Sequence, residues 1–177
     1  MGISVDDIKQ LREETSCGVI DCKNALSQAD GDLTKAKAIL KEKGLQMAAK
    51  KGSRLAKEGR IEAYVHMGSK IGVLLEVNCE TDFVARNEDF QCFTKDVAMH
   101  IAAMDPWYVT ADDVAEDAVP EGTDRDVFCK EHCLTEQPFV KDQGQTVRDY
   151  LNSLIAKIGE NIVIRRFIRY KVGQDAG

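Results

Sequence analysis

A cysteine with histidines elsewhere in the chain is the arrangement in this sequence that comes nearest to a catalytic site. Cys79 ends a predicted strand close to Asp82, and His66 or His100 has the chemistry of a general base. Such a base would convert the thiol into a nucleophile. However, no known nucleophile motif surrounds Cys79, and cysteines of small intracellular proteins are most often buried as small apolar residues. We therefore favour a structural cysteine over an enzyme.

Cys129, His132 and Cys133 form the second group with chemical potential. Their spacings of three and four residues suit one side of a helix, and sulfur and imidazole ligands suit zinc. A structural zinc site needs four ligands, and no fourth candidate is near in the sequence. Glycine-rich phosphate loops and the HExxH, GxSxG and EF-hand patterns are missing as well. The sequence therefore predicts polar helix residues here, with no catalytic residue, no metal site and no cofactor.

The segment CETDFVARNEDF has no obvious structural role. Thr81, Asp82 and Phe83 follow a strand that ends near Asn78, and a helix begins soon after them, near Asn87. Loops at such positions commonly carry function, because a rigid scaffold presents them to solvent. A phenylalanine in a loop is more often a core residue, whereas an exposed one would be a binding anchor. The pattern alone leaves both alternatives open.

The charge balance argues against a dedicated nucleic-acid binder. The chain has 24 basic and 30 acidic side chains, a net charge of -6, whereas binding to phosphates requires an excess of positive charge. The lysines between residues 41 and 57 have the charge to contact RNA, but a solvated linker is the more common explanation of such a run. We expect no direct contact with nucleic acid.

Nothing in the sequence predicts export or a membrane span. No apolar stretch approaches the roughly 18 residues that a spanning helix needs. The amino terminus, MGISVDDIKQ, has neither the cationic nor the apolar block of a secretory signal. We therefore expect a soluble cytoplasmic protein with reduced thiols. The six cysteines are Cys17, Cys22, Cys79, Cys92, Cys129 and Cys133.

Residues 1–44 predict three short helices. Ser4 and Asp7 have the spacing of a capping box, in which each side chain satisfies a backbone donor of the first turn. Apolar residues recur at helical spacing on both sides of a break at Asp30-Gly31-Asp32, and Gly44 is expected to end the third helix. Three amphipathic helices this short need one another, so we expect a ubiquitin-associated-like domain, a shape that usually binds proteins.

Residues 45–59 predict a linker rich in lysine and alanine that is helical in part, and residues 60–177 predict an α+β core domain. In the core, apolar residues alternate around a turn at Gly68-Ser69, which is the pattern of a β-hairpin. Two helices follow, one capped by Asn87 and one begun by a second capping box at Thr146. The simplest assembly is a three-stranded, mainly antiparallel sheet with helices packed on one face. We also expect residues 1–58 to fold separately from this domain.

The last strand, NIVIRRFIRYKV, completes the predicted sheet. Strict alternation would put two sets of side chains on opposite faces. The apolar face would hold Ile162, Ile164, Ile168, Tyr170 and Val172, and the wet face would hold Arg165, Arg169 and Lys171. Before that strand, residues 105–143 are strongly acidic and contain all three prolines. We expect an irregular region there, with a short helix near residues 124–134.

Four motifs, in order along the chain, resemble the elongation factor Ts family. They are LREETSCGVIDCKNAL with ADGDLTKA and KEKG, then GVLLEVNCETDFVARN, then EQPFVKD, and finally IAKIGENIVIRRF. The first differs from the usual family pattern at Ser16-Cys17, where the family has Gly-Ala, and at Val19-Ile20, where it has two methionines. The chain is also short, since its acidic region replaces the second core half and the coiled coil of longer members.

The resemblance implies a guanine nucleotide exchange factor for elongation factor Tu in translation elongation, without covalent catalysis. It implies that a loop of Thr81, Asp82, Phe83 and Val84 displaces magnesium, and that Phe83 enters a pocket on the partner. It further implies that the amino-terminal module grips the partner's nucleotide-binding domain. The residues carried over for this grip are Arg12, Val19, Ile20 and Lys23.

Two further expectations concern the assembly and a rival function. Short members of the family are implied to pair, and the long terminal strand leaves an open sheet edge, so we expect a homodimer through the core. The rival from another class is a ubiquitin-associated-like adaptor that binds helices or nascent chains without exchange activity. It accounts for residues 1–44 and leaves the Thr81-Asp82-Phe83 segment without a role.

Overall fold

The computed structural model describes residues 3–15 and 17–174, and these fall into two compact units. The first, which we call the helical unit, takes the chain up to Arg54 together with Leu151–Asn161. The second, the sheet unit, takes Leu55–Tyr150 together with the residues from Ile162 onward. The predicted separate folding of residues 1–58 stays a prediction, and the assignment of Leu151–Asn161 to the helical unit was not foreseen from the sequence.

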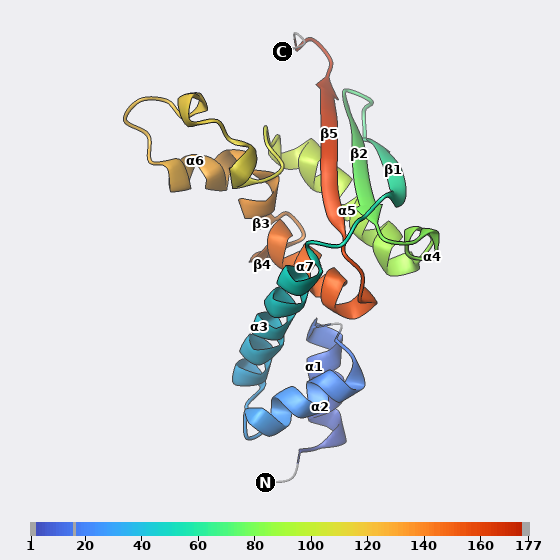
Figure 1. Cartoon of the computed structure of the whole chain (residues 1–177). Coiled ribbons are helices and arrows are strands. Elements are labelled where there is room, and N and C mark those ends of the chain that lie inside the picture. Colours follow the sequence, from blue (N-terminus) through green and yellow to red (C-terminus); the bar gives the residue numbers. More distant parts are fainter. Residues whose placement is uncertain (1–2, 16, 175–177) are drawn as a thin grey trace. The chain divides into compact units, whose positions relative to one another are not determined.

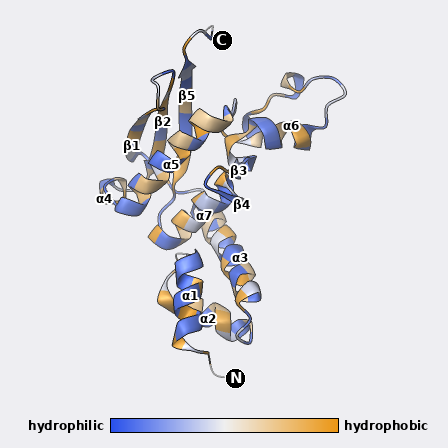
Figure 2. Ribbon diagram, turned by 180° about the vertical axis from the view of Figure 1, so that it is seen from behind, coloured by the Kyte–Doolittle hydropathy of each residue, from blue (hydrophilic) through white to orange (hydrophobic). Residues whose placement is uncertain are grey.

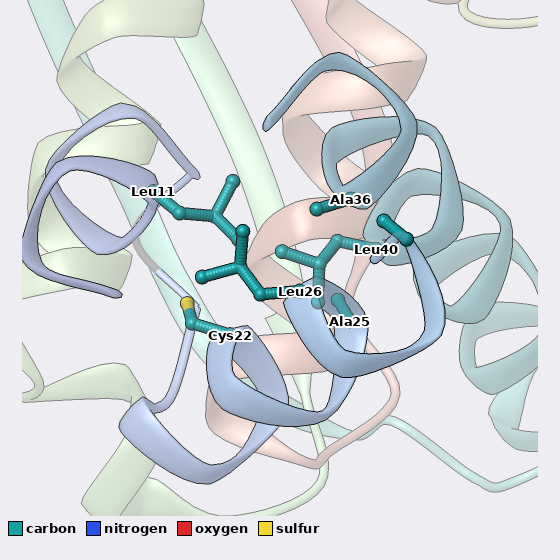
Figure 3. Close-up of a cluster of buried hydrophobic side chains, with 7 residues drawn as sticks. Leu11, Cys22, Ala25, Leu26, Ala36 and Leu40 are labelled. Atoms are coloured by element: carbon teal, nitrogen blue, oxygen red, sulfur yellow. The ribbon is translucent and has the colours of Figure 1, made fainter. Parts of the chain in front are cut away.

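The helical unit contains the three predicted helices, α1 (Val5–Thr15), α2 (Val19–Gln28) and α3 (Leu33–Lys51). The capping box at α1 is confirmed, because the Asp7 amide donates to Ser4 Oγ and the Ser4 amide donates to Asp7 Oδ2. Figure 3 shows the core where the three helices meet. The buried residues of this core are Leu11, Cys22, Ala25, Leu26, Ala29, Ala36 and Leu40. A ubiquitin-associated-like fold remains a prediction.

The prediction that the third helix ends at Gly44 is wrong, because α3 continues to Lys51. A Cβ on Gly44 would lie 3.8 Å from the Cβ of Ala156 and from the Asn152 carbonyl oxygen. The glycine therefore lies where α3 meets the later segment of the chain, and its small size suits the close approach. Lys51 also donates to the Gly159 carbonyl oxygen, which supports the last turn of α3.

The sheet unit contains a three-stranded antiparallel sheet in the order β1 (Glu58–Val65), β2 (Ile71–Cys79) and β5 (Val163–Lys171). The turn between β1 and β2 has Gly68 at φ 87° and Ser69 at φ 55°, so the glycine suits the left-handed backbone there. Helix α5 (Glu88–Met104) crosses one face of the sheet, behind it in Figure 1 and in front of it in Figure 2. The α+β class and the three-stranded antiparallel sheet are confirmed, and the predicted helix capped by Asn87 packs on the sheet.

The predicted faces of the last strand are wrong, because a bulge changes the alternation. Val77 pairs with Ile164 but its neighbour Glu76 pairs with Arg166, so Arg165 is the extra residue. Beyond the bulge Ile168 and Tyr170 lie on the open face, and Arg169 takes the covered face instead. Its guanidinium contacts Asp105 at 3.0 Å and donates to the Ala102 carbonyl oxygen, so the buried charge is compensated.

In β1, too, a charged side chain lies on the covered face while apolar side chains lie on the other. Glu62 is buried on the covered face, where it pairs with Arg60 at 2.8 Å and accepts a hydrogen bond from Thr94 Oγ1. The apolar side chains of β1 point to the other face. Five large side chains are exposed on what we call the open sheet face, namely Ile61, Val65, Leu74, Ile168 and Tyr170. Within the part of the chain that the structure describes, this face of the sheet therefore exposes several apolar side chains.

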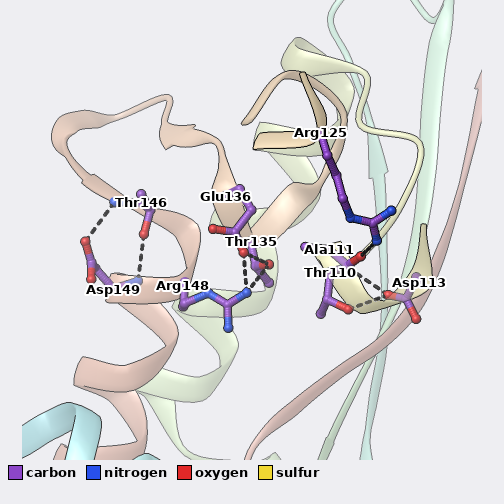
Figure 4. A network of polar contacts seen from close by, with 9 residues as sticks. All are labelled: Thr110, Ala111, Asp113, Arg125, Thr135, Glu136, Thr146, Arg148 and Asp149. Carbon is purple, nitrogen blue, oxygen red and sulfur yellow. Dashed lines mark hydrogen bonds and ion pairs between the residues drawn. The ribbon is translucent and has the colours of Figure 1, made fainter. Parts of the chain in front are cut away.

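The acidic region 105–143 is irregular, as predicted, and α6 (Arg125–His132) is its expected short helix. Phe128, Cys129 and Cys133 pack with Val114 in a small core of its own. The short elements around α6 are η1 (Ala111–Asp113), η2 (Glu116–Ala118), η3 (Leu134–Glu136), β3 (Pro138–Phe139) and β4 (Asp142–Thr146). Arg125 donates to the carbonyl oxygen of Ala111 (Figure 4) and also to that of Val114, and these hydrogen bonds tie α6 to the segment before it.

Helix α7 (Val147–Ile158) follows β4 and begins with the predicted capping box. The Asp149 amide donates to Thr146 Oγ1, and the Thr146 amide donates to Asp149 Oδ2 (Figure 4). Gly159 follows the helix at φ 85°, which also agrees with the prediction. None of the helices in the described part of the chain is both long and apolar enough to cross a membrane.

Candidate partner-binding site

The Thr81-Asp82-Phe83-Val84 segment forms a short helix, α4 (Asp82–Ala85), between β2 and α5. Cys79, the last residue of β2, is fully buried, and its thiol donates to the Thr81 carbonyl oxygen at 3.1 Å. The segment is thus held to the end of the strand from which it departs. The body of α4 packs against β1 and β2.

The other end of α4 is held to α5. The Asn87 amide donates to the Val84 carbonyl oxygen at 2.9 Å, and Asn87 Oδ1 caps α5 by accepting from the amide of Asp89 at 2.8 Å. Asp82 and Arg86 form an ion pair at 2.8 Å along the outer side of α4. Hydrogen bonds at both ends and packing beneath leave little freedom for the backbone of this helix.

Phe83 is the most unusual residue of this segment, because 79% of its surface is exposed. This exposure excludes the core alternative that the sequence left open. Thr81 is exposed as well, while Asp82 and Val84 are half-buried. A large apolar ring that a well-ordered helix presents to solvent has the properties of a binding anchor.

The second set of predicted residues lies in the helical unit, at the start of α2. Val19 and Ile20 are the first two residues of the helix, with 51% and 75% of their surfaces exposed. Lys23 and Arg12 are exposed as well. A core role for Ile20 is therefore excluded. The neighbouring departure at Ser16 lies outside the described residues.

A groove of about 470 Å³ lies beside the start of α2. Arg12 and Val19 belong to its walls, whereas Ile20 and Lys23 do not. The complete lining is Lys9, Arg12, Glu13, Cys17, Gly18, Val19, Asp21, Ala156 and Lys157. Sequence reasoning missed the contribution of α7, and the only signal for it was that Ala156 and Lys157 lie inside the fourth family-like motif.

The electrostatics of the groove are mixed. Asp21 forms an ion pair with Lys43 at 2.5 Å, so one of the two carboxylates in the groove lining is already paired. Cys22, the residue after Asp21, is buried. This burial raises the pKa of its thiol, and the hydrogen bond with Thr15 opposes that shift only in part. With basic and acidic side chains on the same walls, the groove suits a polar and apolar protein surface better than a polyanion.

The residues considered for catalysis have structural roles. The His66 ring is hydrogen-bonded to Tyr64 Oη at 3.1 Å on the hairpin. His100 is fully buried, accepts a hydrogen bond from the Val140 amide at Nδ1, and donates from Nε2 to Gln137 Oε1 at 2.9 Å. The imidazole is therefore neutral, and burial lowers its pKa further.

The residues considered for zinc binding also have structural contacts. His132 stacks on Trp107 at 3.9 Å between ring centroids. Cys133 is fully buried, and burial together with the neighbouring Cys129 raises the pKa of its thiol to about 12. Within residues 3–15 and 17–174 no group of three or more His, Cys, Asp or Glu residues is placed to hold a metal ion.

Comparison with known proteins gives one consistent result. The protein-family model described as "Elongation factor TS" matches residues 21–126 and 125–174 of this chain. A protein named elongation factor Ts from Caldanaerobacter subterraneus is 49% identical, over 97% of this chain and 98% of its own length. Proteins of the same name from Thermoanaerobacter sp. and Carboxydothermus hydrogenoformans are 47% and 48% identical, over 97% and 94% of this chain and 96% and 88% of their own lengths.

Proposed function

Because the chain belongs to the elongation factor Ts family, we propose that it is the guanine nucleotide exchange factor of elongation factor Tu in translation elongation. Such a factor performs no covalent chemistry. It binds the nucleotide-free partner more tightly than the nucleotide-bound one, and linkage then requires that it weaken nucleotide binding by the same factor. We place this activity in the cytoplasm, where translation takes place.

The exposed Phe83 ring on α4 is the observation that carries this proposal. A partner that binds a guanine nucleotide holds it through phosphate contacts and a magnesium ion. We propose that Phe83 fills an apolar pocket of elongation factor Tu close to that ion. Asp82 makes the adjacent polar contact, and Thr81 and Val84 complete the contacting surface. Entry of α4 would displace the magnesium ion and disturb the phosphate site, which weakens nucleotide binding.

The start of α2 has a different role in this proposal. Val19 and Ile20 present apolar surface, and Arg12 and Lys23 add positive charge around it. We propose that these four residues grip the nucleotide-binding domain of elongation factor Tu. Their contribution is affinity, since interactions that are equal in the nucleotide-bound and nucleotide-free states do not change nucleotide release.

The test is the release of a fluorescent guanosine diphosphate from elongation factor Tu. Addition of this protein should accelerate release strongly, and the acceleration should saturate with its concentration. Release at the spontaneous rate under saturating protein would overturn the proposal. Binding without acceleration would instead favour the adaptor function of a ubiquitin-associated-like domain.

We also propose that the protein is a homodimer that pairs through the open sheet face. Ile61 and Val65 are each about two-thirds exposed there, and Tyr170 is 61% exposed. Glu76 and Arg166 form a 2.7 Å ion pair on the same face, so little unpaired charge opposes contact between two copies. Large exposed apolar patches usually mark contact surfaces. Pairing about a two-fold axis would cover this face on both copies at once.

Sedimentation at micromolar concentration tests the dimer. Wild-type protein should sediment at twice 19.6 kDa, and Ile168→Lys should sediment as a monomer, because it places a charge on the open sheet face. Val127→Lys on α6, at a similarly exposed apolar position, is the matched control and should remain dimeric. A wild-type mass of 19.6 kDa would rule the dimer out.

A further inference from the structure

Two cysteines occupy the positions of a hydrophobic staple at the start of α2. Gly18 is the N-cap of this helix, so Cys17 is the residue before the cap and Cys22 is the fourth residue of the helix. Side chains at these two positions pack against each other in many helices and fix the direction in which the chain enters. In this protein cysteines occupy both positions.

The contacts around Cys22 agree with this arrangement. Its sulfur lies 3.8 Å from the carbonyl oxygen of Cys17 and 3.9 Å from Thr15 Oγ1. The Cys17 amide in turn donates to the same Thr15 hydroxyl. Cys17 also packs against the buried cluster to which Cys22 belongs. Cys17 and Cys22 are therefore close neighbours, five residues apart across the cap of the helix.

The two thiols differ in their access to solvent. Cys17 is half-buried and lies in the wall of the groove, whereas Cys22 is fully buried and is not among the lining residues. A small oxidant can therefore reach Cys17 through the groove, and the buried thiol of the cluster against which Cys17 packs is then available to the oxidised sulfur. This division into an accessible thiol and a protected one is typical of thiol pairs that form a disulfide on oxidation.

We propose that Cys17 and Cys22 are an oxidisable pair that forms an intrachain disulfide when a peroxide enters the groove. In the first step the Cys17 thiolate attacks one peroxide oxygen, the O–O bond breaks, and Cys17 becomes a sulfenic acid while hydroxide leaves. In the second step the Cys22 sulfur attacks the Cys17 sulfur. Its proton accompanies the departing hydroxyl group as water. Two thiols and one hydrogen peroxide thus give one disulfide and two waters.

The disulfide would act on the proposed grip of elongation factor Tu, and this consequence rests on the proposed function. Val19 and Ile20 lie between the two cysteines in the sequence, at the first two positions of α2. A covalent bond across the cap redirects this turn, and with it the two apolar contacts. We expect oxidation to raise the half-saturating concentration in the exchange assay by at least about fivefold, while reduction restores it.

Peptide mapping of the full-length Cys92→Ser protein tests the disulfide directly. The substitution removes the exposed thiol of Cys92, which would otherwise compete for oxidant. After peroxide treatment, cleavage before Asp21 separates Cys17 from Cys22 unless the two are bonded. We expect the fragments to stay joined until a reductant is added. Free thiols at both positions, or a disulfide only between Cys129 and Cys133, would overturn the proposal.

The exchange assay separates this inference from the proposed function. Cys92→Ser protein is assayed reduced, oxidised and reduced again, and Cys17→Ala is compared only with its own untreated sample. We expect peroxide to weaken the first protein reversibly and to leave the second unaffected. A mapped disulfide without any change in exchange would overturn the regulatory part. Absence of exchange in reduced protein would instead contradict the proposed function and leave the mapping result standing.

Discussion

Helix α4 and the start of α2 both expose apolar side chains, but they are supported in different ways. Hydrogen bonds from Cys79 and Asn87 hold α4 at its two ends, and the sheet packs beneath it. The start of α2 has Gly18 as its cap, which offers no side-chain acceptor, and a groove lies beside it. The first site is a fixed support for one large ring, and the second offers several smaller contacts beside a groove.

This difference suggests a division of labour between the two sites. A fixed anchor loses little conformational entropy on binding, so more of its interaction energy remains to stabilise a strained state of the partner. A surface made of several smaller contacts can give affinity in several states of the partner. Substitutions at the two sites should therefore change different kinetic parameters.

The largest effect is expected for Phe83→Ala. Removal of an anchor that fills a partner pocket costs about 2 kcal/mol or more, so nucleotide release should slow by at least about tenfold even at saturating protein. Thermal stability should not change, because the ring is exposed. Val127→Ala, which shortens another exposed apolar side chain, is the control. Normal exchange together with a lower melting temperature would show that Phe83 supports the fold instead.

A smaller effect of another kind is expected when Val19 and Ile20 are both changed to alanine. The half-saturating concentration should rise by about five- to tenfold, which corresponds to about 1 to 1.4 kcal/mol. The maximal rate of nucleotide release should stay close to that of wild type. The titration of release rate against protein concentration measures both values. A fall in the maximal rate comparable to that of Phe83→Ala would remove the distinction between the two sites.

The support of α4 is tested by Asn87→Ala. Loss of this cap should lower the free energy of unfolding of the sheet unit by about 1 kcal/mol, measured by urea denaturation. Exchange should slow only modestly, since Phe83 remains present but less well held. Asn24→Ala, at an exposed interior position of α2, is the control and should not destabilise. Slowing as large as that of Phe83→Ala, with unchanged stability, would indicate that Asn87 contacts the partner directly.

Mild acid should lower the stability of the sheet unit through His100. Its pKa is lowered in the folded protein because burial disfavours the imidazolium, and the hydrogen bond with Gln137 opposes this only in part. The unfolded chain therefore binds this proton first, as pH falls below the usual histidine value of about 6.5. Stability should be constant above that pH and decrease below it, by at most about 1.4 kcal/mol per pH unit from this group.

Urea denaturation at several pH values measures this dependence. His100→Gln should lose part of the decrease below pH 6.5, because the group that titrates has been removed. His66→Gln is the control, since His66 lies exposed on the hairpin. An unchanged acid dependence in His100→Gln would show that other groups carry it.

The smallest effect is expected for Gly18→Ser, which gives α2 a side-chain cap. The φ of Gly18 is -63°, so the substitution causes no backbone strain, and the new Cβ would meet only the flexible Asp21 carboxylate, at 3.3 Å. The helical unit should gain a few tenths of a kcal/mol of stability. Gly18→Ala offers no acceptor and should give no such gain. An equal gain from alanine would assign the effect to the unfolded chain, whose freedom both substitutions reduce.

Much of the fold could be predicted because local signals are strong where hydrogen bonds are local. The capping boxes at Ser4 and Thr146, the Asn87 cap and the hairpin turn at Gly68 all occur as expected. Each depends on side chains within a few residues of the backbone groups that they satisfy. The end of α3 was predicted wrongly, because Gly44 contacts a segment more than a hundred residues later in the chain.

The sequence by itself determined the α+β class, the order of the elements and the family, since these follow from periodicity, caps and motifs. Only the tertiary structure decided which face each strand covers, because the bulge at Arg165 changes the alternation and the register with β2 carries Arg169 inward. It also decided that Phe83 is exposed, and that Arg12, Cys17 and two residues of α7 line one groove. Exposure and proximity depend on what packs against a residue, and the partners that pack here come from distant parts of the chain.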